Sequence, residues 1–293
     1  MRSVSATVAS TETYLLAEGP AWDPLRRRVL WVDIDGHRVC EGRVVPGRTA
    51  IECTAVHRFA GTVSAVAAAA DGRLLVAEQE TLTVLDTAGR RTPGPRVIET
   101  GTKSRLNDGK CDPAGRFMVG TLALDARENE EGLFQLRGSH LVPIDTDLAL
   151  SNGLGWSPVG DVFYNTDTLS KVIWARPYYP DSGVWGTRRA LLRFDGEYPD
   201  GLCVDVDGNL WVAVWGSGQV RCYTTSGHLL TVVEVPAPHT SSVAFVGDDL
   251  DLLLITTARS ELTDRQLEQY PDSGKLFLAQ VGTCGTPSPY WAD

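Results

Sequence analysis

A short pattern recurs six times along this chain, at intervals of 42 to 48 residues. In most copies a polar residue and a glycine precede a short apolar run, and a turn then leads into a second apolar run. The residues at the variable position of the six copies are Glu18, Ser64, Asp108, Asn152, Asp200 and Ser242. A period of this size is typical of proteins that are built from repeated structural units. We therefore expect a repeat architecture in which these six residues occupy equivalent places.

Turn signals separate the apolar runs within the repeats. Asp112-Pro113-Ala114-Gly115 and Asp207-Gly208-Asn209 are two examples, in which proline presets the first turn angle and glycine supplies a positive φ. The runs on either side are short and rich in β-branched and aromatic residues, as in β-hairpins. Helical periodicity is almost absent, and we expect one short helical turn over residues 261–269.

Six all-β repeats of about four strands each predict a six-bladed β-propeller with four-stranded blades around a central channel. No linker or low-complexity segment interrupts the chain, so we expect a single domain over residues 1–293. An open solenoid is the alternative, but neither end shows a polar capping repeat. Residues 4–8 alternate with period two, and we expect them to add a strand to the last blade beside residues 275–279 and so close the ring.

The charge balance and the apolar content exclude some classes of partner. The formal net charge is −10, from 37 acidic and 27 basic residues, whereas a nucleic-acid partner requires a basic face. No segment approaches the roughly 20 apolar residues of a membrane helix, and the first residues lack the apolar core of a signal peptide. We therefore expect a cytoplasmic protein with reduced thiols and no nucleic-acid or membrane partner. Cys111 and Cys203 are expected to be small core residues.

In a propeller, the equivalent positions of the repeats converge near the axis. Glu18, Asp108, Asn152 and Asp200 would then share one volume, where several carboxylates repel one another and a bound cation relieves the repulsion. The donors are all oxygen atoms, which suits Ca²⁺, Mg²⁺ or Mn²⁺ better than a structural zinc site. Asp or Asn before Gly is also ordinary turn chemistry, but four copies in register favour a site. The five histidines fall outside the repeated position, which gives no support for a histidine-based triad.

Two further polar residues stand just upstream of the third copy. Arg105 and Asn107 alternate along an extended segment and would therefore face the same side. Both could bind a hydroxylated ligand or an oxyanion. The alternative interpretation is a loop charge beside a turn asparagine, and position alone does not decide between the two.

At these residues the chain resembles the SMP-30/gluconolactonase/luciferin-regenerating family, over about residues 14 to 280. The matching stretches are Glu18-Gly19-Pro20, Trp31-Val32-Asp33-Ile34, Arg105-Leu106-Asn107-Asp108-Gly109-Lys110, Asp112-Pro113-Ala114-Gly115-Arg116-Phe117, Ser151-Asn152-Gly153-Leu154-Gly155-Trp156, Tyr164-Asn165-Thr166-Asp167-Thr168, Pro199-Asp200-Gly201-Leu202 and Thr256-Thr257-Ala258-Arg259. Their occurrence in this order makes the resemblance highly specific.

The resemblance implies a six-bladed propeller with one divalent cation in the channel, which could be Ca, Zn, Mn, Mg or Fe. The implied metal ligands are Glu18, Asn152 and Asp200, and the implied substrate contacts are Arg105 and Asn107. Asp108 then becomes an outer-shell group that could hold a metal-bound water.

One position departs from the pattern of the family. Some members carry an acidic residue that contacts the sugar shortly after a Gly-Thr-Met motif, whereas this chain has Leu124 at that place. The alternative is that the neighbouring Asp125 takes over this contact after a local shift of the chain. The departure indicates that the substrate preference of this chain can differ from that of those members.

The implied activity is metal-dependent hydrolysis of a sugar lactone to its aldonic acid. In this hypothesis the cation polarises the ring carbonyl, Asp200 is the general base with Glu18 as second choice, and Arg105 stabilises the oxyanion. The alternatives are a non-catalytic calcium-binding or regulatory propeller and a hydrolase of another lactone or ester. The sequence leaves the identity of the metal open, as well as the choice between monomer and dimer.

Overall fold

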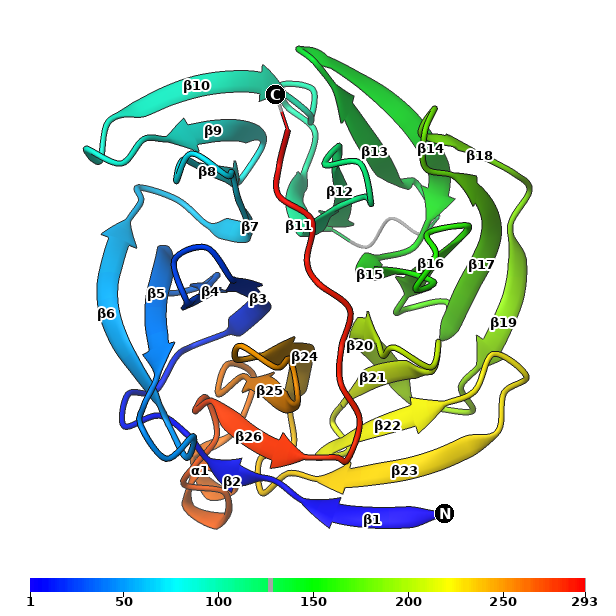
Figure 1. Ribbon diagram of the computed structural model, residues 1–293. Coiled ribbons are helices and arrows are strands. Elements are labelled where there is room, and N and C mark those ends of the chain that lie inside the picture. The colour runs from blue at the N-terminus through cyan, green and yellow to red at the C-terminus, as the bar shows by residue number, and fades with distance from the viewer. Residues whose placement is uncertain (126–128, 293) are drawn as a thin grey trace.

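The structure is a computed structural model that describes residues 1–125 and 129–292. Its strands form six sheets that stand around a central channel like the blades of a propeller (Figure 1). In each blade the chain enters at the innermost strand and runs outward through antiparallel neighbours. The predicted all-β, six-bladed propeller with four-stranded blades is therefore confirmed.

The first three blades contain four consecutive strands each. Blade one is formed by β3 (Ala17–Asp23), β4 (Arg28–Asp33), β5 (Arg38–Val44) and β6 (Ile51–Arg58), blade two by β7 (Val63–Ala68), β8 (Leu74–Glu78), β9 (Thr81–Leu85) and β10 (Arg91–Arg96), and blade three by β11 (Ser104–Cys111), β12 (Phe117–Ala123), β13 (Glu131–Arg137) and β14 (His140–Leu148).

Blades four and five have a fifth strand, and blade six has four strands, of which the outermost comes from the N-terminal segment. Blade four is formed by β15 (Ser151–Trp156), β16 (Val162–Asp167), β17 (Val172–Tyr179), the short β18 (Val184–Trp185) and β19 (Arg189–Arg193), blade five by β20 (Tyr198–Val204), β21 (Leu210–Trp215), β22 (Gln219–Tyr223), β23 (Leu229–Glu234) and β1 (Arg2–Ser5), and blade six by β24 (Thr240–Val246), β25 (Leu252–Thr257), β26 (Phe277–Gln280) and β2 (Thr7–Val8).

Buried aspartates hold the turns between the first two strands of several blades. In blade three, Asp112 Oδ1 accepts hydrogen bonds from the backbone N–H groups of Ala114 and Arg116, at 2.9 and 2.8 Å. In blade five, Asp205 accepts in the same way from Asp207 and Asn209, at 3.0 and 2.8 Å. These side chains accept hydrogen bonds from turn N–H groups that would otherwise be left unpaired. This explains why the turns have such clear signals in the sequence.

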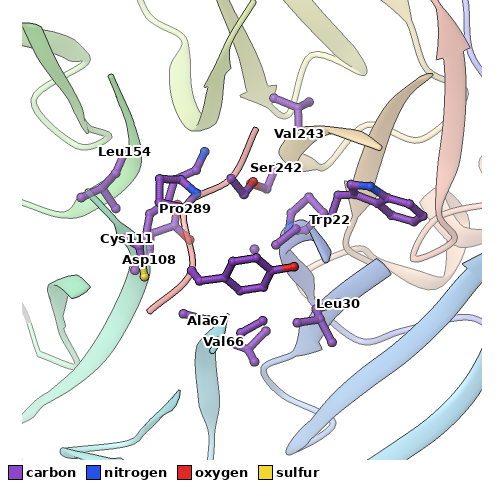
Figure 2. A pocket seen from close by; sticks show the side chains of 18 of the residues that line it. Trp22, Leu30, Val66, Ala67, Asp108, Cys111, Leu154, Ser242, Val243 and Pro289 are labelled. Atoms are coloured by element: carbon purple, nitrogen blue, oxygen red, sulfur yellow. The ribbon is translucent and has the colours of Figure 1, made fainter. Parts of the chain in front are cut away.

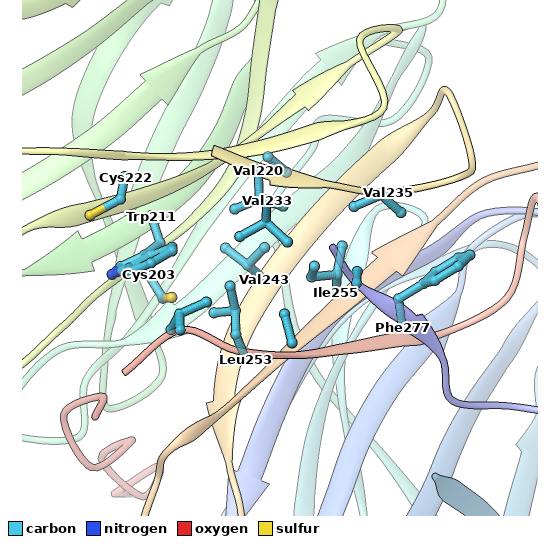
Figure 3. Packing of buried hydrophobic residues seen from close by; sticks show 14 of the residues in the cluster. Cys203, Trp211, Val220, Cys222, Val233, Val235, Val243, Leu253, Ile255 and Phe277 are labelled. Atoms are coloured by element: carbon cyan, nitrogen blue, oxygen red, sulfur yellow. The ribbon is translucent and has the colours of Figure 1, made fainter. Parts of the chain in front are cut away.

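The hydrophobic core is divided among the interfaces between blades. The buried apolar residues that the structure describes form six clusters, each of which joins two neighbouring blades. Figure 3 shows the cluster between blades five and six, in which Trp211 and Cys203 face Val243 and Leu253. Cys111 lies in the corresponding cluster between blades two and three. Each blade therefore buries both faces against its neighbours, and all six cysteines are free.

The N-terminal segment closes the ring, but in a different manner from the prediction. Only Thr7 and Val8 add a strand to blade six, where they pair antiparallel with Leu278 and Phe277. The preceding β1 instead runs parallel to β23 at the outer edge of blade five. The prediction that residues 4–8 form one strand of the last blade was therefore wrong for residues 4–6. The segment crosses from one blade to the next and covers an exposed sheet edge on each.

A short helix is present near the expected place, with a later start. The helix α1 (Asp264–Gln269) begins after Thr263, whose side chain accepts from the Gln266 N–H while the Gln266 side chain accepts from the Thr263 N–H. This capping box fixes the start of the helix, so residues 261–263 precede it. Within the described part of the chain, no helix is long and apolar enough to cross a membrane.

The C-terminal tail closes one end of the channel (Figure 1). Trp291 N–H donates to the Ala68 carbonyl at 2.8 Å, and the Tyr290 hydroxyl donates to Asp23 Oδ1 at 2.6 Å. Figure 2 shows Pro289 of the tail above a cavity of about 60 Å³ that the later halves of the inner strands also line. The tail thus shuts the end of the channel at which the inner strands finish.

In blades four and five, the glycine of the repeated motif is required by the close approach of the neighbouring inner strand. A Cβ atom on Gly153 would lie 2.6 Å from the Asp200 carbonyl oxygen and 2.7 Å from the Leu202 nitrogen, both in the backbone of the next blade. A Cβ on Gly201 would lie 2.1 Å from the Ser242 Oγ. A larger residue would push the blades apart, so the motif maintains the width of the channel.

We expect the Gly153→Ala substitution to lower the free energy of unfolding by about 1–3 kcal/mol, because overpacking of a rigid site has that cost. Gly61→Ala is the matched control, since its Cβ would meet only the flexible end of the Gln79 side chain, at 3.2 Å. Urea unfolding of the two variants measures the difference. Equal stabilities would contradict the role given to the inner-strand glycine.

Candidate functional site

Each inner strand has a β-bulge at the repeated motif. In blade one the pairing of β3 with β4 shifts register between Glu18 and Ala21, and the other five inner strands shift at or beside the equivalent place. A bulge bends its strand and re-aims the side chains that lie on it. All six variable residues are buried, with 2% to 7% of their surface exposed. The fold thus places polar side chains close to the channel, where strands of a propeller are otherwise apolar.

The predicted site residues gather in one cavity of about 390 Å³, at the end of the channel where the inner strands begin. Its polar lining consists of Glu18, Arg105, Asn107, Asn152, Thr168, Asp200 and Glu261, and its apolar lining of Leu16, Ile34, Leu122, Leu150, Leu169, Tyr198 and Trp215. The predicted ligands and substrate contacts are therefore brought together by blades one, three, four and five.

The remaining variable residues lie elsewhere. Asp108 and Ser242 line the smaller cavity beneath the tail (Figure 2), and the Ser64 hydroxyl donates to the Asn107 carbonyl at 2.9 Å. Asp108 is thus separated from the cavity that Glu18 and Asp200 line, which is a geometry suited to a supporting group.

A chain of hydrogen bonds fixes the orientation of the two amides. The Thr168 hydroxyl donates to the Pro199 carbonyl at 2.7 Å, so its oxygen accepts from Asn152 Nδ2 at 2.9 Å. Asn152 Oδ1 then accepts from Asn107 Nδ2 at 2.6 Å, and Asn107 Oδ1 accepts from the Arg105 guanidinium at 2.7 Å. Thr168 therefore determines which end of Asn152 is the oxygen, and it directs that oxygen away from its own hydroxyl.

Asn107 is fully engaged as a donor. Its Nδ2 also donates to the Ser151 carbonyl at 3.0 Å, which uses the second amide hydrogen. Toward a ligand it can therefore offer only the second lone pair of its oxygen. The neighbouring Arg105 bonds both Asn107 and the Leu106 carbonyl through one nitrogen, Nη1, and its guanidinium has further N–H donors to offer.

The carboxylates of the site destabilise one another in their charged forms. Burial raises the pKa of Glu18 well above its usual range, and the nearby Asp108 and Asp200 raise it further. Burial and Asp108 raise the pKa of Asp200 in the same way. Burial also raises the pKa of Asp108 to about 6, although Lys110 and Arg105 act in the opposite direction. The surroundings of the cluster therefore compensate its negative charge poorly.

The donor set fits a divalent cation. Asp200 Oδ1 is buried without a hydrogen-bond partner, and a cation beside Glu18 and Asp200 would compensate both charges. Among the described residues, no three His, Cys, Asp or Glu side chains could hold a metal by themselves. The cavity instead combines two carboxylates with an amide oxygen, an oxygen set typical of hard cations.

Some lining residues could not be inferred from the repeat. The sequence showed Thr168 only as part of a motif and did not indicate its role. The apolar lining residues were not predicted either, although Leu16, Leu150 and Tyr198 each stand two positions before a predicted ligand. Leu124, by contrast, is 56% exposed. Among the described residues of its strand and the turn that follows, Leu122 lines the cavity, whereas Leu124 and Asp125 do not.

The class of this protein is a six-bladed propeller with carboxylates, amides and a guanidinium gathered in one cavity at an end of its channel. The profile of the SMP-30/Gluconolactonase/LRE-like region matches residues 16–259. The chain belongs to this family, as its motifs predict.

Similar proteins extend over the whole chain. Regucalcin of Xenopus laevis is 32% identical over 94% of this chain and 94% of its own. The Bacillus subtilis protein YvrE, which has the provisional name sugar lactone lactonase, is 30% identical over 99% of this chain and 100% of its own. A solved structure of regucalcin from Agrobacterium tumefaciens, described as a calcium-binding protein, has a TM-score of 0.93 and 28% identity, and covers 100% of this chain and 99% of that one.

Because of this carboxylate cluster, the free energy of unfolding of the metal-free protein should fall as the pH rises through the acid range. Asp108 has a pKa of about 6 in the folded state, against 3.8 for an ordinary aspartate, so the folded state binds more protons and stability falls between these two pH values. At 1.4 kcal/mol per pKa unit the loss is about 3 kcal/mol. Asp108→Asn should therefore gain stability relative to the wild type as the pH rises from 4 to 7.

Urea unfolding in the presence of a chelator, at pH 4 to 8, measures this effect. The difference between wild type and Asp108→Asn reports Asp108 together with its effect on the pKa values of Glu18 and Asp200, and it cancels the other carboxylates of the chain. Parallel curves for the two proteins would contradict the raised pKa of Asp108.

Proposed function

We propose that the protein is a lactonase that depends on one divalent cation and hydrolyses a lactone to its hydroxy acid. Membership of the SMP-30/gluconolactonase family supports this activity, and the names of its relatives suggest a sugar lactone as the substrate. The observation that carries the proposal is the buried Asp200 Oδ1, which has no partner and lines one cavity with Glu18, Asn152 and Arg105. An unpaired carboxylate oxygen beside a guanidinium is suited to ester hydrolysis.

Glu18, Asn152 and Asp200 are the residues that would hold the cation, through oxygen atoms. Their chemistry favours Ca²⁺, Mg²⁺ or Mn²⁺, and Zn²⁺ and Fe²⁺ are included in the test below. A divalent cation in such a site supplies Lewis-acid polarisation of the ring carbonyl. Thr168 supports the site from outside by orienting the Asn152 amide.

Asp200 is the proposed general base. It takes a proton from the attacking water, whose oxygen forms a bond to the carbonyl carbon, and the ring C–O bond then breaks. The ring oxygen takes that proton from Asp200 and becomes the hydroxyl of the open acid, which returns Asp200 to its carboxylate form. Glu18 is the second candidate, but its Oε2 already accepts from the Gly19 N–H at 2.9 Å, whereas Asp200 Oδ1 is free to accept a proton.

Arg105 is proposed to stabilise the oxyanion that forms on the carbonyl oxygen. Asn107 fixes the guanidinium by accepting its N–H at 2.7 Å, and its oxygen can still accept a hydrogen bond from a substrate hydroxyl. These two residues thus act as the substrate contacts.

A non-catalytic cation-binding propeller is the second candidate function. The description of the Agrobacterium tumefaciens regucalcin as a calcium-binding protein favours it. Such a protein needs the carboxylates and Asn152 but has no need of a guanidinium that points into the same cavity. Arg105 therefore favours the lactonase.

A panel of lactones crossed with a panel of cations tests the proposal. Chelator-treated protein should release acid from at least one lactone only after Ca²⁺, Mg²⁺, Mn²⁺, Zn²⁺ or Fe²⁺ is added, after correction for spontaneous ring opening. Asp200→Asn should lower kcat by about 10²–10⁴-fold, as expected for loss of a general base. Asp207→Asn is the matched control, because Asp207 is exposed in the turn that follows the same strand. No turnover with any cation would favour the second candidate function.

Thr168 gives a test of the metal site that does not depend on turnover. Thr168→Val removes the hydroxyl that orients Asn152, and it should weaken cation binding about 10- to 100-fold, as is typical for groups that orient metal ligands. Thr168→Ser keeps the hydroxyl and should bind nearly as tightly as the wild type. Calorimetric titration of the chelator-treated proteins measures both, and equal affinities for Val and Ser would contradict the role of Thr168.

A further inference from the structure

Half of the residues that line the 390 Å³ cavity are large and apolar. Seven large hydrophobic side chains line it, contributed by blades one, three, four and five, and we refer to them together as the apolar collar: Leu16, Ile34, Leu122, Leu150, Leu169, Tyr198 and Trp215. Leu169 is 52% exposed and Tyr198 is 39% exposed. Single exposed hydrophobic residues are normal on a protein surface, but a contiguous set around one cavity indicates a binding surface.

The collar is a regular product of the fold. Leu16, Leu150 and Tyr198 stand two positions before Glu18, Asn152 and Asp200, so each faces the same side of its strand, one layer nearer the mouth. A strand neighbour stands opposite each of the three. Ile34 donates its N–H to the Leu16 carbonyl at 2.9 Å, Leu122 bridges to Leu150, and Tyr198 pairs with Trp215.

One wall of the collar is flat and held in place. The Trp215 ring stacks on His239, with ring centroids 4.2 Å apart and planes 16° apart. A fixed aromatic surface binds apolar groups with little loss of side-chain entropy. Trp215 pairs with Tyr198 in the adjacent strand, and Tyr198 stands two residues before Asp200.

The cavity has few free partners for hydroxyl groups. Both amide hydrogens of Asn107 are engaged, Asn152 Nδ2 donates to Thr168, and the Thr168 hydroxyl donates to a carbonyl. In the described lining, the polar groups that remain besides the two carboxylates of the proposed metal site are Arg105, Glu261 and one lone pair of the Asn107 oxygen. A substrate with a hydroxyl on most of its ring carbons would bury several of them without partners, at a cost in free energy for each.

We propose that the substrate is a lactone whose ring carries an alkyl or aryl substituent and few hydroxyls. The inference rests on the proposed lactonase function and narrows it away from polyhydroxylated sugar lactones. The ring carbonyl lies among Asp200, Glu18 and Arg105, and the substituent contacts the apolar collar. Each methylene of the substituent that enters the collar is removed from water, which is worth about 0.8 kcal/mol.

A series of γ-lactones that differ only in chain length tests the inference. With the activating cation present, kcat/KM should rise about fourfold per methylene from γ-valerolactone to γ-octalactone, as 0.8 kcal/mol per methylene implies. The value for γ-octalactone should exceed that for xylono- or galactono-1,4-lactone by at least tenfold.

Variants of the collar show whether the preference arises there. Leu150→Asn should lower the ratio of γ-octalactone to γ-butyrolactone turnover at least tenfold. Leu169→Asn, at a more exposed position, should lower the same ratio in a protein whose fold is less affected. Leu124→Asn is the control, because Leu124 is exposed and lies outside the cavity lining, and it should leave the ratio unchanged.

The possible outcomes separate the two proposals. Faster hydrolysis of the sugar lactones, with no dependence on alkyl chain length, would overturn the substrate class and leave the lactonase intact. A chain-length dependence that the Leu150 and Leu169 variants do not change would overturn the role of the collar. Absence of turnover for every lactone with every cation would overturn the lactonase proposal and this inference with it.

Discussion

The close approach of neighbouring inner strands is the constraint on which the rest of this molecule depends. Where Gly153 passes the backbone at Asp200, even a methyl group would collide, so blades four and five can only meet at a glycine. The same motif has a bulge that turns the preceding residue toward the channel. Because one motif sets both the spacing of the blades and the direction of the polar side chain, construction of the ring and construction of the site cannot be separated in this fold.

Without a cation, the buried carboxylates of the site destabilise the folded protein. This repulsion links the stability of the protein to the proposed binding of a cation. Glu18, Asp108 and Asp200 are buried near one another, and burial raises the pKa of each. The six inter-blade clusters tolerate this repulsion because they lie outside the channel and retain their packing whatever the charge of the site. A rigid ring can therefore keep these charges close together, whereas a more deformable core would open and so separate them.

Much of the fold could be predicted from the sequence, because repeated motifs and turn residues act locally. The position of Glu18 or Asp200 in its repeat is enough to place it on an inner strand. Features that depend on distant pairing could not be predicted, such as the parallel pairing of β1 with β23. The same holds for Thr168, whose role follows from contacts with Asn152 and with Pro199 of the next blade. The metal-ligand and catalytic roles of the site residues remain predictions.

The crossing of the N-terminal segment from blade five to blade six has a consequence for the order of folding. Arg2 pairs with Thr231 and Thr7 pairs with Leu278, so both contacts join the first part of the chain to the last. Contacts between successive blades can form as each blade is completed, whereas these pairs must wait for the whole polypeptide. Until then blade six has an unpaired strand edge and apolar faces that await a partner, which makes ring closure the stage most exposed to aggregation.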